Sequence, residues 1–325
     1  MDLLIQIEVL VNIFFQSLGE WLAPIAAGLS FLGTEEFYIL LLPAIYWCID
    51  AGIGFRIGIM LVATNSINGY LKMLFHSPRP FWVDSRVKAL AQETSFGMPS
   101  GHSQNAASLW GLVAVKFKKT WLTIVSICAI ILIGWSRLYL GVHFTRDVLS
   151  GWLIGGLLIL AFLLLEKPVT KWITTKSLGF QLLVILLVAV LIIGLGYLAA
   201  TSGNNWTMPG EWIDQSLAAS SVAPDPFNLE GCFTIAGVWL GFASGYAWWL
   251  KKFGTMKVTG SIGSRIARYF IGLAGLFALY LGLKLVFPEN PLWLGLLLRC
   301  VRYALIGLWV SALAPLLFTK LKLDK

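Results

Sequence analysis

The sequence predicts an all-α fold, a helical bundle that crosses a membrane several times. Hydrophobic residues make up 58% of the 325 residues and charged residues only 12%, whereas a soluble chain carries about 25% charged residues. The mean hydropathy is +0.80, and apolar residues recur in runs close to the roughly 20 residues that span a bilayer. These properties exclude a soluble enzyme, a disordered scaffold and a nucleic-acid-binding protein.

Apolar runs bounded by polar residues, glycine or proline predict ten helices. They cover residues 20–33, 36–49, 52–75, 101–117, 121–139, 143–165, 179–200, 231–250, 264–287 and 291–318. The first run is short for a full span, and before it Gln6, Glu8, Asn12 and Gln16 lie among large apolar residues. We therefore expect residues 1–19 to form an interfacial or re-entrant helix.

The connections between these helices alternate in charge, and this predicts the topology. Lysines gather in four connections or ends: Lys116, Lys118 and Lys119; Lys167, Lys171 and Lys176; Lys251, Lys252 and Lys257; Lys320, Lys322 and Lys325. The segment 201–230 between two of them has four acidic residues and no Lys or Arg. By the positive-inside rule the lysine face and the C-terminus are cytoplasmic, so residues 76–100 and the turn around Val142 lie on the outer face.

The first outer-face motif joins Lys72 and Arg79 at the end of the helix predicted over 52–75. Pro78 and Pro80 stop that helix, so Arg79 is expected on non-helical backbone. Taken alone, the motif also fits an ordinary interfacial helix end, with Lys72 extending toward the lipid headgroups.

The second motif, Pro99-Ser100-Gly101-His102, opens the next predicted helix. Free backbone N–H groups and the positive end of the helix dipole make such a start an anion site. An imidazole beside it can pass a proton to a leaving oxygen. The alternative is simple capping by Ser100, with His102 an incidental residue of the first turn.

The third motif contains Arg137, His143 and Asp147. Four residues separate the histidine from the aspartate at the start of the helix predicted over 143–165, so the carboxylate can orient the imidazole as a nucleophile or base. A structural ion pair is the alternative. Two of the three histidines of the chain fall in these motifs, and charged groups at membrane depth are costly and usually functional.

Together the three motifs read Lys-x6-Arg-Pro, Pro-Ser-Gly-His and Ser-Arg-x5-His-x3-Asp, and this pattern resembles the type 2 phosphatidic acid phosphatase family. These are lipid phosphate phosphatases related to vanadium haloperoxidases. The resemblance covers about residues 36–165 and implies a six-span core, which we place at residues 20–165. The remaining residues 166–325 would form a C-terminal membrane extension of about four spans, with an outer loop at 201–230.

The resemblance implies metal-independent phosphoryl transfer in two steps through a phosphohistidine, with no cofactor. Carried over residue by residue, His143 is the nucleophile, Asp147 orients it, and His102 protonates the leaving alcohol and then activates water. The residues that would hold the phosphoryl oxygens are Lys72, Arg79, Ser100, Gly101 and Arg137. Three cations and helix-start N–H groups suit a transition state whose charge lies on three oxygens.

The extension contains no histidine, but Arg299 and Arg302 share one face of the helix predicted over 291–318. They would form either a second contact for an anionic lipid or structural pairs with carbonyls, Glu289 or loop acids. The overall expectation is an enzyme of the inner membrane that hydrolyses a terminal lipid phosphate on the non-cytoplasmic side. A lipid phosphotransferase and a non-enzymatic lipid or anion transporter are the alternatives; the substrate headgroup and the oligomeric state are left open.

Overall fold

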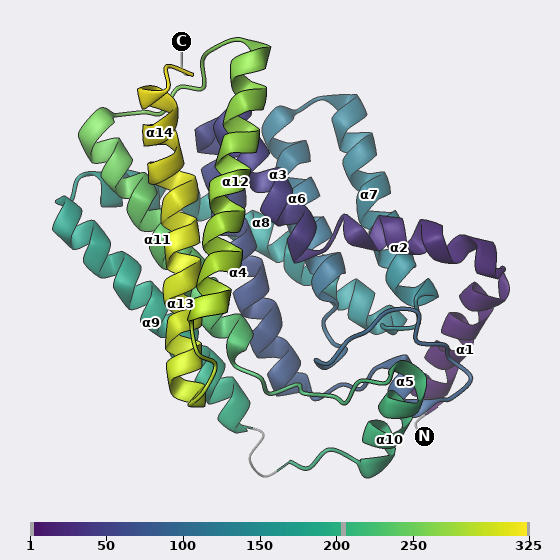
Figure 1. The fold of residues 1–325 in the computed structure, drawn as a ribbon. Coiled ribbons are helices and arrows are strands. Elements are labelled where there is room, and N and C mark those ends of the chain that lie inside the picture. Colours follow the sequence, from purple (N-terminus) through teal and green to yellow (C-terminus); the bar gives the residue numbers. More distant parts are fainter. Residues whose placement is uncertain (1–2, 203–205, 324–325) are drawn as a thin grey trace. The chain divides into compact units, whose positions relative to one another are not determined.

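The computed structural model describes residues 3–202 and 206–323, and every regular element within them is a helix (Figure 1). The all-α prediction is therefore confirmed. Lys325 and residues 203–205 of the predicted outer loop lie outside the described residues. The chain divides into two compact units, which are described separately. The predicted domain boundaries at residues 19 and 165 remain predictions.

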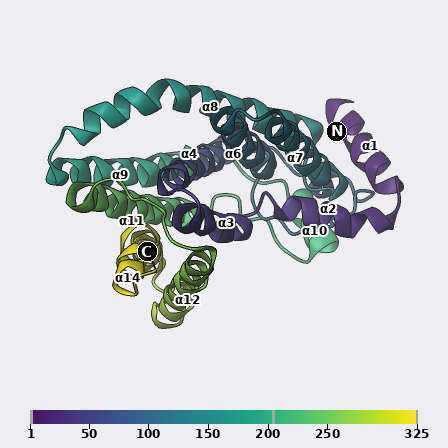
Figure 2. The ribbon, with the colours of Figure 1, turned by 90° about the horizontal axis from the view of Figure 1, so that it is seen from above.

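Unit 1 comprises Met1–Phe37, Ile67–Phe162 and Leu198–Asn228. Its elements are α1 (Leu3–Ser17), a 3-10 turn (Glu20–Leu22), α2 (Ala23–Phe31), the end of α4 (Ala51–Phe75), α5 (Pro80–Val83), α6 (Gly101–Phe117), α7 (Thr120–Tyr139), the first part of α8 (Thr145–Thr174) and α10 (Gly210–Ser220). Helices α6 and α7 lie side by side, joined by a short turn at Lys118 (Figure 2). Helices α1 and α2 both pack on α7.

Unit 2 comprises Tyr38–Ser66, Leu163–Tyr197 and Leu229–Lys325. It holds α3 (Glu35–Cys48), most of α9 (Leu178–Ser202), α11 (Glu230–Phe253), α12 (Ile262–Val286), α13 (Leu292–Leu308), a π-helical turn (Trp309–Leu313) and α14 (Ala314–Lys320). Helices α11 and α13 pack closely side by side (Figure 1). Glycines permit this approach, because a Cβ atom on Gly241 would lie 1.8 Å from the Ala304 carbonyl oxygen.

The sequence predicted one helix over 291–318, and the continuous helical stretch Leu292–Lys320 confirms it, although a π-helical turn at Trp309–Leu313 interrupts the α-helical pattern between α13 and α14. Pro315 explains the interruption, because it has no N–H to donate to the preceding turn. Two carbonyls of that turn bond to α3 instead: Val310 accepts from Trp47 Nε1 at 2.8 Å and Ser311 from the Tyr46 hydroxyl at 3.1 Å.

Five helices in the described residues are long and apolar enough to cross a membrane, or six if the bent pair α1 and α2 forms one broken span. The pair bends by 89°, which fits a re-entrant loop. The predicted count of ten spans exceeds this number because four of the helices are too short or too polar to cross a membrane: α3, α4, α6 and α11. Helix α6 shows the reason: it has only 17 residues, and Ser103, Gln104, Asn105 and Ser108 make it more polar than a lipid-spanning helix.

Candidate active site

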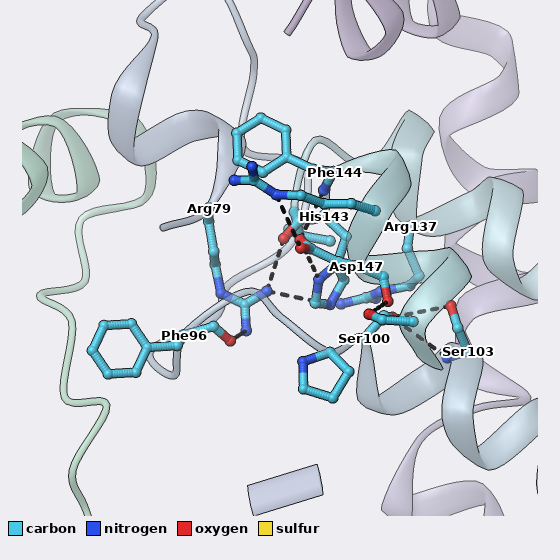
Figure 3. Close-up of polar contacts among 12 residues, drawn as sticks. Arg79, Phe96, Ser100, Ser103, Arg137, His143, Phe144 and Asp147 are labelled. Carbon is cyan, nitrogen blue, oxygen red and sulfur yellow. Dashed lines mark hydrogen bonds and ion pairs between the residues drawn. The ribbon is translucent and has the colours of Figure 1, made fainter. Parts of the chain in front are cut away.

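The buried imidazole of His143 lies between a carboxylate and a guanidinium (Figure 3). Its Nδ1 is 3.3 Å from Asp147 Oδ2, and its Nε2 is 3.4 Å from Arg79 Nη1. Because a guanidinium only donates, Nε2 must be the acceptor, and the proton is assigned to Nδ1, where it faces the carboxylate. The lone pair of Nε2 therefore points toward the arginine.

The arrangement differs from the prediction in one respect, because His143 precedes the first residue of α8, Thr145. The pair is held by a turn and not by one helix face. Asp147 Oδ2 also accepts the backbone N–H of Phe144 at 2.9 Å, which ties the turn to the helix. The extent of α8 was also underestimated, since the helix continues beyond residue 165 to Thr174.

Arg79 is fully buried, and its guanidinium is held mainly by backbone carbonyls. Nε donates to Ser95 O at 2.6 Å, Nη1 to Val142 O at 2.9 Å and Nη2 to Phe96 O at 3.2 Å. The extended backbone of Arg79, with φ −94° and ψ 156°, agrees with the prediction from the flanking prolines. The three carbonyls fix the plane of the Arg79 guanidinium, and none of these bonds depends on a bound ligand.

Lys72 and Arg137 complete a cluster of three cations. Lys72 Nζ donates to Ser95 Oγ at 2.8 Å, and the same hydroxyl accepts from Arg79 Nη2 at 3.0 Å. Arg137 Nη1 donates to Ser30 Oγ at 2.5 Å. The structure thus brings together the three cations that the sequence separated by 7 to 65 positions. Their summed charge suits an anion with several oxygens.

Glu93, which the sequence analysis did not identify, lies within this cluster. Its Oε2 is 3.0 Å from Arg79 Nη2, and its Oε1 pairs with Arg137 Nη2. Burial alone would raise the pKa of Glu93, but the charges of Arg79, Arg137 and Lys72 together hold the pKa well below its ordinary value. Glu93 is therefore an anion at neutral pH.

Burial lowers the pKa of His143 well below its ordinary value, and the charges of Arg79, Arg137 and Lys72 act in the same direction. The imidazole is consequently neutral at neutral pH. A neutral ring with its proton on Nδ1 carries an unprotonated Nε2, which faces Arg79 Nη1, and an unprotonated nitrogen is what a nitrogen nucleophile requires.

Ser100 caps the N-terminus of α6, as predicted, and its Oγ accepts the Ser103 N–H at 3.4 Å. Its own N–H is not free, because it donates to the Asp147 carbonyl at 2.9 Å. In the described part of the chain, no hydrogen-bond partner is found for the N–H groups of Gly101 and His102, the first two of the helix. The free donors of the helix start therefore belong to residues 101 and 102.

His102 lies beside Gly33 of the segment after α2 and interacts electrostatically with Arg137 and Glu93.

The third histidine, His76, was assigned no catalytic or binding role by the sequence analysis. Its ring stacks on Trp206, and the two ring centroids are 4.7 Å apart. Phe96 and Phe227 also contact this pair of rings, and the Asp225 N–H donates to Thr94 O at 3.0 Å. The segment 206–228 thus packs on the loop that carries Glu93 and Ser95.

Comparison with known proteins gives the family. Residues 53–171 match the model of the PAP2 superfamily, and residues 233–325 match that of the PAP2 superfamily phosphatase transmembrane extension. Phosphatidylglycerophosphatase B of Bacillus subtilis is 35% identical over 42% of this chain and 72% of its own length. This chain belongs to the PAP2 superfamily.

Two further similarities concern another curated relative and a solved structure. Undecaprenyl-diphosphatase of Sulfolobus acidocaldarius is 32% identical over 31% of this chain and 50% of its own length. A crystal structure of a transmembrane PAP2 phosphatidylglycerolphosphate phosphatase from Bacillus subtilis aligns with a TM-score of 0.43 at 26% identity, covering 50% of this chain and 86% of that one. The PAP2 match includes all three motifs, and with the apolar helices it makes this chain an integral membrane protein.

Helix α1 lies before the residues that match the PAP2 model, and its side chains hold the loop that carries His143. Asn12 Nδ2 donates to the carbonyls of Leu138 at 2.8 Å and His143 at 3.0 Å. Glu8 accepts the Arg146 N–H at 2.9 Å, and its carboxylate lies 3.4 Å from Arg146 Nε. Two of the polar residues that suggested an interfacial helix, Glu8 and Asn12, therefore hold the backbone around His143, a role that only their irregular placement among apolar residues could have indicated.

Replacing Asn12 with leucine is expected to lower kcat by about 10- to 100-fold with little change in KM, because a small displacement of a reacting group costs rate rather than binding. Steady-state kinetics on the purified protein measure this split. Gln6→Leu, on the exposed side of α1, is the matched control and should retain activity. A rise in KM with kcat unchanged would show that Asn12 does not position the His143 loop.

Proposed function

We propose that this PAP2 protein is a metal-independent phosphatase that removes the terminal phosphate of an amphiphilic lipid phosphate through a phosphohistidine at His143. The observation that carries the proposal is the orientation of one ring: Nδ1 faces Asp147, while Nε2 faces Arg79 and the cation cluster. A phosphoryl group held by Arg79, Arg137 and Lys72 would present its phosphorus to that nitrogen. In-line attack then requires no further rearrangement of the imidazole.

In the first step His143 Nε2 would form a bond to phosphorus while the bond from phosphorus to the lipid oxygen breaks. His102 would donate its proton to that oxygen, so that a neutral alcohol leaves. In the second step His102 would remove a proton from water as the water oxygen attacks phosphorus, the P–N bond breaks and inorganic phosphate is released. The N–H groups of Gly101 and His102, the Ser100 hydroxyl and the three cations would bind the phosphoryl oxygens.

Lipid phosphates are proposed as substrates because both curated relatives are named for such compounds, a phosphatidylglycerophosphate and a polyprenyl diphosphate. Metal independence is proposed because three cations and two N–H groups already supply the positive charge that phosphoryl transfer needs. In the part of the chain that the structure describes, no group of three or more His, Cys, Asp or Glu side chains gathers to hold a metal ion.

The purified protein in detergent with excess EDTA is expected to release phosphate from at least one member of a lipid panel. The panel contains phosphatidylglycerol phosphate, phosphatidic acid, a sphingoid phosphate and a polyprenyl diphosphate. Activity should change less than about twofold between EDTA and added Mg²⁺, and vanadate should inhibit as an analogue of the transition state. Activity restored only by Mg²⁺ would refute metal independence, and transfer of phosphate to an added alcohol in place of release would identify a transferase. No release from any lipid would favour the transporter alternative.

We further propose that the site opens on the non-cytoplasmic side of the cell membrane and that the C-terminus is cytoplasmic. In unit 1, α6 runs from Gly101 at the site to Lys116 near its other end, and α7 returns from Lys119 to Arg137. A helix of 17 residues is about 25 Å long. The lysine ends therefore lie opposite the site, and lysine-rich ends favour the cytoplasm.

The second predicted anion contact involves Arg302 more than Arg299. Arg299 pairs with Glu230, as the structural alternative required. Arg302 is 8% exposed, its Nε has no hydrogen-bond partner among the described residues, and it stacks on Tyr280 and Tyr303. With Lys284 it lines a cavity of about 240 Å³ in unit 2. That volume is below the roughly 300–1,000 Å³ of drug-sized sites, so it suits an anionic headgroup and not a whole lipid.

Arg302→Gln is expected to weaken binding of an anionic lipid at least about tenfold while hydrolysis of a short soluble phosphate is unchanged, because Arg302 lies outside the catalytic motifs. Arg299→Gln, whose charge is already paired, is the matched control and should have the smaller effect. Binding is measured with nanodiscs of phosphatidylglycerol and of phosphatidylcholine. Equal binding by Arg302→Gln and the unaltered protein would leave Arg302 a structural residue.

A further inference from the structure

Glu93 occupies the position between Arg79 and Arg137 that the proposed reaction needs for phosphoryl oxygens. One carboxylate oxygen pairs with each arginine. A carboxylate and a phosphoryl group bind guanidinium groups in the same way, each through two oxygens. A phosphate that binds both arginines would therefore have to take these donors from Glu93.

The arginines do not depend on Glu93 for their positions. Arg79 keeps four further hydrogen bonds, to Ser95 O, Ser95 Oγ, Val142 O and Phe96 O. Arg137 keeps its bond to Ser30 Oγ. Departure of the Glu93 carboxylate would thus leave the cation cluster in place and able to accept another anion.

Glu93 is also the member of the group best placed to leave. Its side chain is 20% exposed, whereas those of Arg79 and Arg137 are 0% and 2% exposed. It lies in the irregular loop between α5 and α6, flanked by exposed Gln92 and Thr94. Moving this side chain outward breaks no helix hydrogen bond, since residues 91–95 form none.

We propose that Glu93 is an internal competitor of the substrate, a carboxylate that fills the phosphate position of the empty site and is displaced when a phosphate monoester or inorganic phosphate binds. This inference rests on the proposed function. It makes Glu93 a determinant of affinity: the competitor weakens phosphate binding, and its return between the arginines favours release of the product. Without it, phosphate would bind more tightly and leave more slowly.

The test is direct binding of inorganic phosphate and vanadate, by calorimetry without turnover, to the full-length protein and to Glu93→Gln. Glu93→Gln is expected to bind both anions at least about tenfold more tightly, since a like charge beside the incoming phosphate is removed. Its KM and its inhibition constant for phosphate should fall together, with kcat reduced if product release becomes limiting. Glu211→Gln, an exposed carboxylate of α10, changes the net charge equally and should leave binding unaltered.

Unchanged or weaker anion binding by Glu93→Gln would overturn the inference, because a residue that only orients the arginines loses affinity when neutralised. A vanadate-bound structure of the unaltered protein provides a second measurement that needs no variant. It should show the Glu93 carboxylate away from Arg79 Nη2, and Glu93 still bridging both arginines beside bound vanadate would refute the competition. The panel assay tests the proposed function separately. That proposal is wrong if inorganic phosphate binds to the protein but no lipid phosphate of the panel is hydrolysed.

Discussion

Replacing His143 with alanine is expected to abolish turnover, by at least about 10⁴-fold in kcat, because it removes Nε2, the ring nitrogen that faces Arg79 and that we propose as the nucleophile. The measurement combines steady-state assays with a rapid quench of labelled substrate. The unaltered protein should retain label in an acid-labile, base-stable form, as expected for phosphorus bonded to an imidazole nitrogen. His143→Ala should retain none.

The control for this result is His76→Ala, which removes the histidine that stacks on Trp206 and not one that faces the cations. It should keep turnover within a few-fold and keep the trapped label. Thermal unfolding of both variants shows that the fold is retained. Label trapped on His143→Ala in the amount seen for the unaltered protein would show that another residue is the nucleophile.

Replacing His102 with alanine is expected to lower kcat on a lipid phosphate by about 10²- to 10⁴-fold, the usual contribution of a general acid. The loss should depend on the leaving group, since an alkoxide needs a proton and an activated aryl oxide does not. With an aryl phosphate, the burst of released phenol should therefore stay close to that of the unaltered protein, while the second step remains slow because water lacks its base.

The comparison of the two substrates distinguishes proton transfer from binding. An equal loss of the first step on alkyl and aryl phosphates would assign His102 to binding of the phosphoryl group through its side chain or its N–H. Ser103→Ala, which removes the hydroxyl bonded to Ser100 Oγ in the same first turn of α6, is a matched control for local disturbance. It should affect both substrates alike and only mildly.

Local patterns in the sequence were sufficient for much of the site. Prolines on either side of Arg79 dictate its extended backbone, and Ser100 before Gly101 marks the start of α6, because both effects act within a few residues. The spacing of four between His143 and Asp147 brings imidazole and carboxylate together, although by a turn and not by a helix face. Composition alone was enough to predict helices and membrane spans, but the sequence overestimated how many helices of the described residues are long and apolar enough to cross a membrane.

The sequence by itself determined the helical class, the three motifs and the three cations Lys72, Arg79 and Arg137 of the site. Only the tertiary structure decided that Glu93 lies between two arginines and that Asn12 holds the carbonyl of His143, 131 positions away. Both residues belong to segments without a diagnostic local pattern. Their partners are chosen by the packing of α1 on α7 and by the path of the loop before α6, and such long-range contacts depend on the shape of the whole unit and not on spacing along one helix.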